Sequence, residues 1–132
     1  MIRYLLDTNI VIYTMNNRPQ TVKEAFDKHQ DAIAVSSITM MELFYGAECS
    51  GNPERNRRVI EGFAVRLTVL DYDERAASHT AQIRAALKSV GKPIGPYDAM
   101  IAGHARSQGL EVVTNNTNEF ERVSGLQISN WV

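Results

Sequence analysis

Short runs with β-strand character alternate along this 132-residue chain with longer segments of helical periodicity. Strands are expected at residues 3–6, 32–35, 68–70 and 111–114, and a short run at 127–129 could add a fifth strand at the edge. Alternation of this kind is typical of a parallel sheet whose faces are covered by helices. We therefore expect an α/β fold with three α/β/α layers, built on a small parallel sheet of four to five strands flanked by helices.

The helices between these strands carry their own start and stop signals. Asp7 follows the first strand and can cap a helix, while Pro96 presets the backbone of a helix that Gly109 ends. The clearest helix begins at Asp73. Its inward positions recur every three or four residues: Ala76, Thr80, Ile83, Leu87 and Val90.

Length and composition limit the class of protein. A chain of 132 residues suits one compact domain, so residues 1–132 are expected to form a single unit. The formal net charge of -1 lacks the extended basic field of many nucleic-acid-binding proteins, which neither proves nor excludes an RNA substrate. Cys49 is the only cysteine, which excludes an internal disulfide and fits a reducing compartment. With no signal peptide or membrane span recognisable, a cytoplasmic location is expected.

Four acidic residues follow strand ends or lie near the helix starts that face those ends: Asp7, Glu42, Asp98 and Glu119. The carboxyl ends of parallel strands meet at one edge of the sheet, where ligands bind. Two carboxylates about 4 Å apart repel by roughly 4 kcal/mol at an effective dielectric constant of about 20, so a cluster of them needs a cation or a proton. Because no zinc-type set of cysteine and histidine exists, oxygen-ligated Mg²⁺ or Mn²⁺ is the natural cation.

Each acid also has a structural explanation that needs no active site. Asp7 can simply cap a helix, and Glu42 fits a capping box with Thr39. Asp98 can complement a helix dipole, and Glu119 can be an ordinary loop acid. The coincidence of all four, with polar asparagines beside two of them, favours a common site. These asparagines are Asn9, Asn115 and Asn116.

The histidines add little to this site. His104 lies six residues after Asp98, roughly 240° around a helix, and should therefore point away from that acid. His29 and His79 have no partner at metal-ligand spacing.

Four ordered segments resemble the acidic motifs of PIN-domain nucleases: residues 5–9 (LLDTN), 37–43 (SITMMEL), 95–102 (GPYDAMIA) and 114–120 (TNNTNEF). Within that superfamily the chain is similar to the VapC toxins of bacterial toxin–antitoxin pairs, nearly from end to end. The resemblance implies a magnesium-dependent endoribonuclease that cleaves structured RNA, often a tRNA anticodon stem-loop, with initiator tRNA the best candidate. Cleavage of that RNA would stop translation.

The resemblance also implies partners. A VapB-type antitoxin would wrap the toxin and block its acidic pocket. The toxin would pair as a homodimer through the helices that hold Glu42 and Ile83.

The family motifs assign roles to individual residues. Many PIN domains have an aspartate where this chain has Asn116, so Glu119 is expected to supply the fourth carboxylate beside the first three, Asp7, Glu42 and Asp98. As a hypothesis, Asp7 and Asp98 ligate Mg²⁺ directly, with Mn²⁺ as a substitute, while the two glutamates hold its waters or a second, weaker ion. The expected supporting residues are Asn9, Thr114 and Asn116.

Two other functions remain open from the sequence. A haloacid-dehalogenase-type phosphohydrolase also has an acid after its first strand, but it requires a second aspartate where Asn9 stands. A non-catalytic RNA-binding or protein-interaction domain could keep the same fold, and Asn116 at an acidic position of the family gives this alternative some support.

Overall fold

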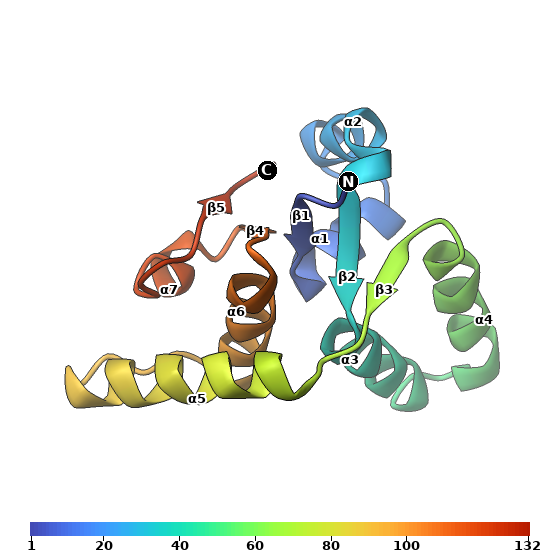
Figure 1. The fold of residues 1–132 in the computed structure, drawn as a ribbon. Coiled ribbons are helices and arrows are strands. Elements are labelled where there is room, and N and C mark those ends of the chain that lie inside the picture. The colour runs from blue at the N-terminus through green and yellow to red at the C-terminus, as the bar shows by residue number, and fades with distance from the viewer.

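A five-stranded, wholly parallel sheet forms the centre of the computed structural model, which describes residues 1–132 (Figure 1). The strand order is β3-β2-β1-β4-β5, with β1 in the middle. The strands are β1 (Tyr4–Leu6), β2 (Ile33–Ser36), β3 (Thr68–Leu70), β4 (Glu111–Val113) and β5 (Ile128–Ser129). Every strand expected from the sequence is present, including the fifth at the edge, and each boundary lies within one residue of its expected place.

Helices cover both faces of this sheet. They are α1 (Thr8–Met15), α2 (Gln20–Lys28), α3 (Ser37–Glu48), α4 (Pro53–Ala64), α5 (Glu74–Ser89), α6 (Pro96–Gln108) and α7 (Thr117–Phe120), with a short 3-10 turn at Gln30–Ala32. One hydrophobic cluster joins the sheet to α1, α2, α3 and α4, and a second joins it to α5, α6 and α7. Successive residues of β1 enter opposite clusters, Tyr4 and Leu6 one and Leu5 the other, as the pleat of a strand requires. The α/β/α layering is therefore confirmed.

The expected capping signals operate at several helix ends. The Asp7 side chain accepts a hydrogen bond from the Ile10 amide at 3.0 Å, and Asp73 caps α5 in the same way. Pro96 occupies the first turn of α6, and Gly109 ends that helix with a left-handed backbone (φ 68°) that glycine adopts without strain.

The capping box predicted for Glu42 and Thr39 is wrong. Helix α3 begins at Ser37 and is capped by Ser36, whose hydroxyl accepts a hydrogen bond from the Ile38 amide at 3.0 Å. Glu42 therefore lies in the second turn of α3, beyond the unpaired amides that a capping box would satisfy. The mistake arose because Thr39 is also an acceptable cap and stands three residues before a glutamate. Helix α7, which carries Glu119, was also not predicted.

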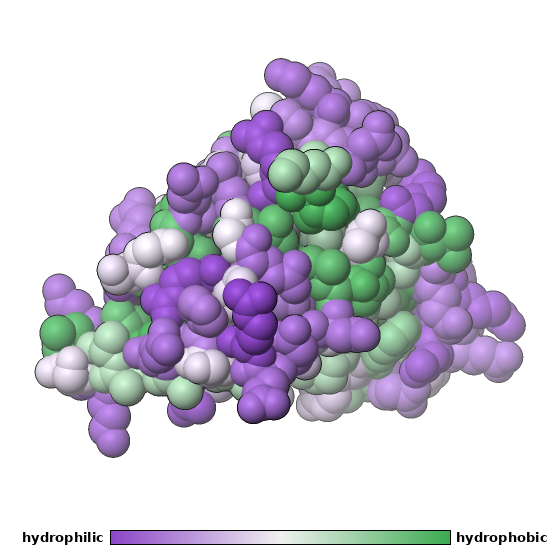
Figure 2. Space-filling model, in the orientation of Figure 1, coloured by the Kyte–Doolittle hydropathy of each residue, from purple (hydrophilic) through white to green (hydrophobic).

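The surface is mixed in character. Figure 2 shows hydrophilic residues over α2 and α4, with hydrophobic residues exposed in the middle of the molecule near β2 and β3. None of the helices combines the length and the apolar character needed to cross a membrane.

Candidate active site

The fold brings the predicted acids to the carboxyl end of the sheet. Asp7 directly follows β1, and Asn116 lies just after β4, which pairs with β1 in the sheet. Glu42 lies on the helix that leaves β2, and Asp98 lies in the first turn of α6. Asp98 is under electrostatic influence from the other three acids, so the four carboxylates share one region.

Asp7 is the most buried of these acids, with 3% of its surface exposed. One carboxylate oxygen accepts the Ile10 amide, and the other accepts a short hydrogen bond from the Thr114 hydroxyl. Burial raises the pKa of Asp7 above its ordinary value, and the negative charge of Glu42 adds to this effect. The hydrogen bonds from Thr114 and Ile10 oppose the rise because they stabilise the charged form. Two hydrogen bonds thus fix the buried carboxylate at the point where β1 and β4 end.

Asp98 and Glu119 form a second pair of acids, bridged by an amide. The side-chain nitrogen of Asn116 lies 2.9 Å from a Glu119 oxygen and 3.5 Å from an Asp98 oxygen. Burial raises the pKa of Asp98 to about 7, helped by a hydrogen bond to Glu119 and by the charges of Glu119, Asp7 and Glu42. The pKa of Glu119 is lowered, chiefly by the same hydrogen bond from Asp98. Of the two acids, Asp98 is therefore the one that binds a proton more readily.

Glu42 is held by a hydrogen bond from a threonine hydroxyl. The Thr8 hydroxyl donates a hydrogen bond to a Glu42 oxygen at 2.7 Å and lies 3.2 Å from the Thr39 hydroxyl. Thr8 immediately follows Asp7, so the turn between β1 and α1 positions both an acid and the donor that fixes a second acid.

The supporting residues expected from the sequence separate into two groups. Thr114 and Asn116 bind the acids directly, and the Asn116 amide itself donates to the Thr114 hydroxyl at 2.9 Å. The Asn9 side chain is exposed and takes no part in these hydrogen bonds, whereas its backbone amide faces Asp7.

Sequence reasoning missed two contributors. Thr8 belongs to the first acidic motif, but a hydroxyl next to an aspartate gives no signal that it will reach Glu42. The backbone amide of Gly95 binds Glu119, and a side chain at Gly95 would lie 3.6 Å from an Asp98 oxygen. Its position next to Pro96, immediately before the helix that carries Asp98, was the only available hint.

The donor chemistry of this region fits a hard divalent cation. As the side chains lie, no group of three or more Asp, Glu, His or Cys residues is arranged to hold a metal ion. Mg²⁺, however, is commonly held by only one or two carboxylates, with water and substrate phosphate completing its shell. Burial, and to a smaller extent the neighbouring carboxylates, raise the pKa values of Asp7 and Asp98, and a bound cation would stabilise the charged form of both acids.

His104 does not join the acids. Its side chain is fully buried and its Nδ1 lies 2.8 Å from the Ser36 hydroxyl, while its ring meets Tyr72 edge-on. The expectation that it points away from Asp98 agrees with this arrangement.

Comparison with known proteins places this arrangement in a family. Residues 4–126 match the PIN domain. A tRNA(fMet)-specific endonuclease VapC from Shigella flexneri is 59% identical over 131 residues, covering 99% of each chain. Ribonuclease VapC2 from Haemophilus influenzae is 52% identical over 132 residues, covering 100% of each chain.

Comparison with solved structures leads to the same family. The crystal structure of DNA-bound VapBC from Salmonella typhimurium contains a chain that superposes with a TM-score of 0.94, at 56% identity and with 100% of both chains covered. These matches rule against the haloacid-dehalogenase alternative. The chain belongs to the PIN-domain family and, within it, to the VapC ribonucleases of VapBC toxin–antitoxin systems.

Proposed function

We propose that this protein is a magnesium-dependent endoribonuclease that cleaves initiator tRNA in its anticodon stem-loop and thereby inhibits translation. The observation that carries the proposal is the gathering of Asp7, Glu42, Asp98 and Glu119 at the carboxyl end of one sheet. The relative from Shigella flexneri, named as specific for tRNA(fMet), supports the choice of substrate.

Asp7 and Asp98 are the proposed direct ligands of the cation, for which Mn²⁺ can substitute. Glu42 and Glu119 would hold its water molecules or a second, weaker ion. When bound, the ion supplies positive charge to the phosphodiester and lowers the pKa of a water molecule. Asp98 must lose its proton to act as a ligand. Burial and neighbouring negative charge raise its pKa to about 7, so the proton can leave near neutral pH.

The remaining residues of the site keep these carboxylates in place. Thr114 fixes Asp7, Thr8 fixes Glu42, and Asn116 bridges Asp98 and Glu119. Hydrogen-bonding partners of this kind orient metal ligands, and their loss typically reduces metal affinity or activity about 10- to 100-fold. We assign Thr8 to this supporting group in addition to Thr114 and Asn116, while Asn9 contributes through its backbone.

The proposed partners follow from the family. The relatives from Salmonella typhimurium and Rickettsia felis were solved as VapBC complexes, which supports a VapB-type antitoxin for this chain. We further propose that residues 1–132 act as a single nuclease domain in the cytoplasm. We also propose a homodimer through α3 and α5, because α3 exposes Met41 and Tyr45 at 39% and 69% of their surfaces.

The direct test is incubation of antitoxin-free protein with total tRNA and Mg²⁺ or Mn²⁺, followed by sequencing of the RNA ends. The proposal expects discrete cuts in initiator tRNA that disappear with EDTA. Intact RNA that is nevertheless bound by the folded protein would instead support the non-catalytic alternative, which the amide of Asn116 at an acidic family position favours.

A further inference from the structure

Positive charge gathers on one side of the acidic site, around the loop that connects α5 to α6. Between Glu74 and Asp98 the chain contains no acidic residue, yet it contains four cations, Arg75, Arg84, Lys88 and Lys92. The ion pairs of the protein lie elsewhere, on α2 and between or within α3 and α4. None of these four cations therefore pairs with a carboxylate, and the Arg75 guanidinium instead donates to the Ser107 carbonyl.

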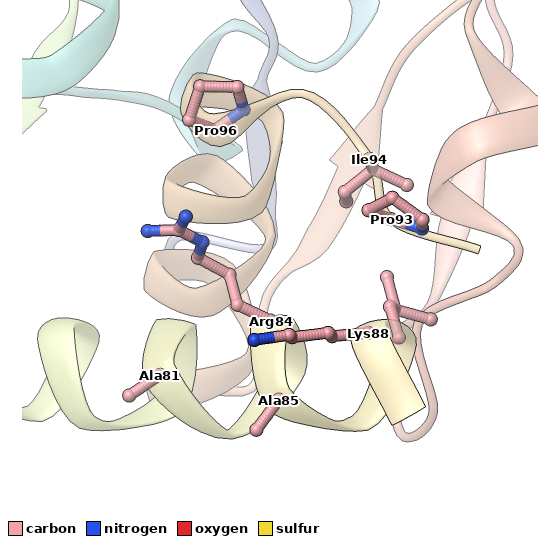
Figure 3. A pocket seen from close by; sticks show the side chains of 8 residues that line it. Ala81, Arg84, Ala85, Lys88, Pro93, Ile94 and Pro96 are labelled. Atoms are coloured by element: carbon pink, nitrogen blue, oxygen red, sulfur yellow. The ribbon is translucent and has the colours of Figure 1, made fainter. Parts of the chain in front are cut away.

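Two hollows lie on either side of this loop. One has a volume of about 450 Å³, with Arg84 and Lys88 at its rim and a mainly apolar lining that includes Pro93, Ile94 and Pro96. Figure 3 shows the Arg84 side chain rising from α5 beside α6, below Pro96, and the Lys88 side chain lying along α5 below the loop with Pro93 and Ile94.

The second hollow has a volume of about 610 Å³ and shares Pro93 with the first. Its lining is polar and includes the cations Lys92 and Arg122, the carboxylate Glu121 and the amide Asn118.

The loop between the hollows is tied to the acidic site. The Arg122 guanidinium donates a hydrogen bond to the Pro93 carbonyl at 3.1 Å, and the Gly95 amide binds Glu119. The Gly95 carbonyl accepts the first amide hydrogen bond of the helix that holds Asp98, from Ala99 at 2.9 Å. A strand of nucleic acid lying across the loop would therefore lead directly to the carboxylates.

We propose that these two hollows form a path for the RNA strand that flanks the cleaved phosphodiester. A base that has left its stack lies on the apolar surface of Pro93, Ile94 and Pro96, and the adjacent phosphates meet Arg84, Lys88 and Lys92. Single-stranded segments are recognised in this way, by cations along the backbone and flat apolar contacts to bases. This inference rests on the proposed ribonuclease function and specifies how its substrate is held.

The test measures binding of fluorescein-labelled initiator tRNA to a cleavage-deficient Asp98→Asn protein, by fluorescence anisotropy at several salt concentrations. Each of Arg84→Ala and Lys88→Ala should weaken binding about three- to tenfold near physiological salt and reduce the slope of log K against log salt by about 0.7 to 0.9. Lys28→Ala removes the same charge from exposed α2, at the opposite end of the molecule (Figure 1), and should leave the slope unchanged.

A further variant separates the apolar contact from the charges. Ile94→Ser should weaken binding without changing the salt slope, because it removes no charge. Affinities and slopes that equal those of the Lys28→Ala control for both basic variants would overturn the proposed path. The proposed path would also be overturned if the basic variants weaken binding of a VapB-type antitoxin but not binding of RNA.

Cleavage by the unsubstituted protein, measured in parallel, reports on the ribonuclease function separately. If the unsubstituted protein cleaves the tRNA but the variants bind it as tightly as the control, only the proposed RNA path is refuted. If the unsubstituted protein does not cleave the tRNA, the proposed ribonuclease function is refuted.

Discussion

Asn116 donates its side-chain amide to Glu119 at 2.9 Å, at a family position where many PIN domains have an aspartate. The same amide nitrogen lies 3.5 Å from Asp98, so a neutral group contacts both acids where a third acid would add to their repulsion. Burial and the nearby carboxylates nevertheless disfavour the charge of Asp98 and raise its pKa to about 7.

The first prediction concerns this titration. Replacing Glu119→Gln removes one negative charge and leaves a neutral amide oxygen, a weaker acceptor than a carboxylate, to receive the hydrogen bond from protonated Asp98. The pKa of Asp98 in the metal-free protein should therefore fall from about 7 toward its ordinary value, without reaching it, since burial remains the largest cause. Carboxyl ¹³C chemical shifts recorded through a pH titration measure this directly. An unchanged pKa would show that the two carboxyl groups do not interact.

Thr8 provides the second prediction. Thr8→Val keeps the shape of the side chain but removes the hydroxyl that holds Glu42 at 2.7 Å. Cleavage should slow by about 10- to 100-fold, the range seen when a residue that orients metal ligands is lost. Thr8→Ser keeps the hydroxyl and should retain most of the activity. Single-turnover cleavage rates compare the two variants, and equal rates would exclude a positioning role for this hydroxyl.

Close packing of α5 on α6 leads to the third prediction. A methyl group at Gly103 of α6 would lie 2.7 Å from the Thr80 backbone nitrogen and 2.8 Å from its Cα on α5, which forces the helices apart. Gly103→Ala should lower the free energy of unfolding by about 1–3 kcal/mol. Gly46 in α3 is the matched control, because a methyl group there meets nothing within 4 Å.

Gly46→Ala should raise stability by roughly 0.5–1 kcal/mol, since glycine inside a helix is unfavourable. Urea unfolding of both variants measures these changes. Stability losses of similar size at the two positions would contradict the close helix contact.

The fourth prediction follows from His104. Burial lowers the pKa of this imidazole below its ordinary value of 6.5, although the charges of Asp73 and Asp71 oppose the shift. The unfolded chain therefore binds a proton more readily than the folded one. The contribution of neutral His104 to stability is complete above the ordinary pKa and declines as the pH falls through and below 6.5.

His104→Leu should remove this part of the pH dependence, at the cost of the hydrogen bond to Ser36. Urea unfolding of the wild-type protein and the variant between about pH 5 and about pH 8 measures the difference. Parallel stability curves would show that His104 titrates alike in the folded and unfolded states.

Much of this architecture can be predicted from the sequence because its signals are local. The alternation of strands and helices fixes the parallel sheet, and a parallel sheet gathers the residues that follow its strands. The acids at Asp7 and Asp98 lie where helix starts were expected. These signals depend only on periodicity, capping residues and the positions of proline and glycine.

The parts that escaped prediction depend on contacts between distant segments. Thr8 reaches Glu42 across 34 positions and Ser36 reaches His104 across 68, and no local pattern encodes either hydrogen bond. The capping box at Thr39 and Glu42 was wrong because Ser36 and Thr39 are both acceptable caps, and only the fold shows that Ser36 is the one used. Helix α7 has only four residues, too few to show a helical period.

The central claim is that four converging carboxylates carry out metal-dependent cleavage of RNA. It is tested most directly by single-turnover cleavage of initiator tRNA in Mg²⁺, comparing the wild type with Asp7→Asn, Glu42→Gln, Asp98→Asn and Glu119→Gln. Glu54→Gln serves as the control, because this acid is exposed on α4 and paired with Arg58 at 3.3 Å. Losses of at least about 100-fold are expected for Asp7→Asn and Asp98→Asn, smaller losses for the two glutamates, and none for the control. Cleavage by folded Asp98→Asn or Asp7→Asn at the wild-type rate would contradict the claim.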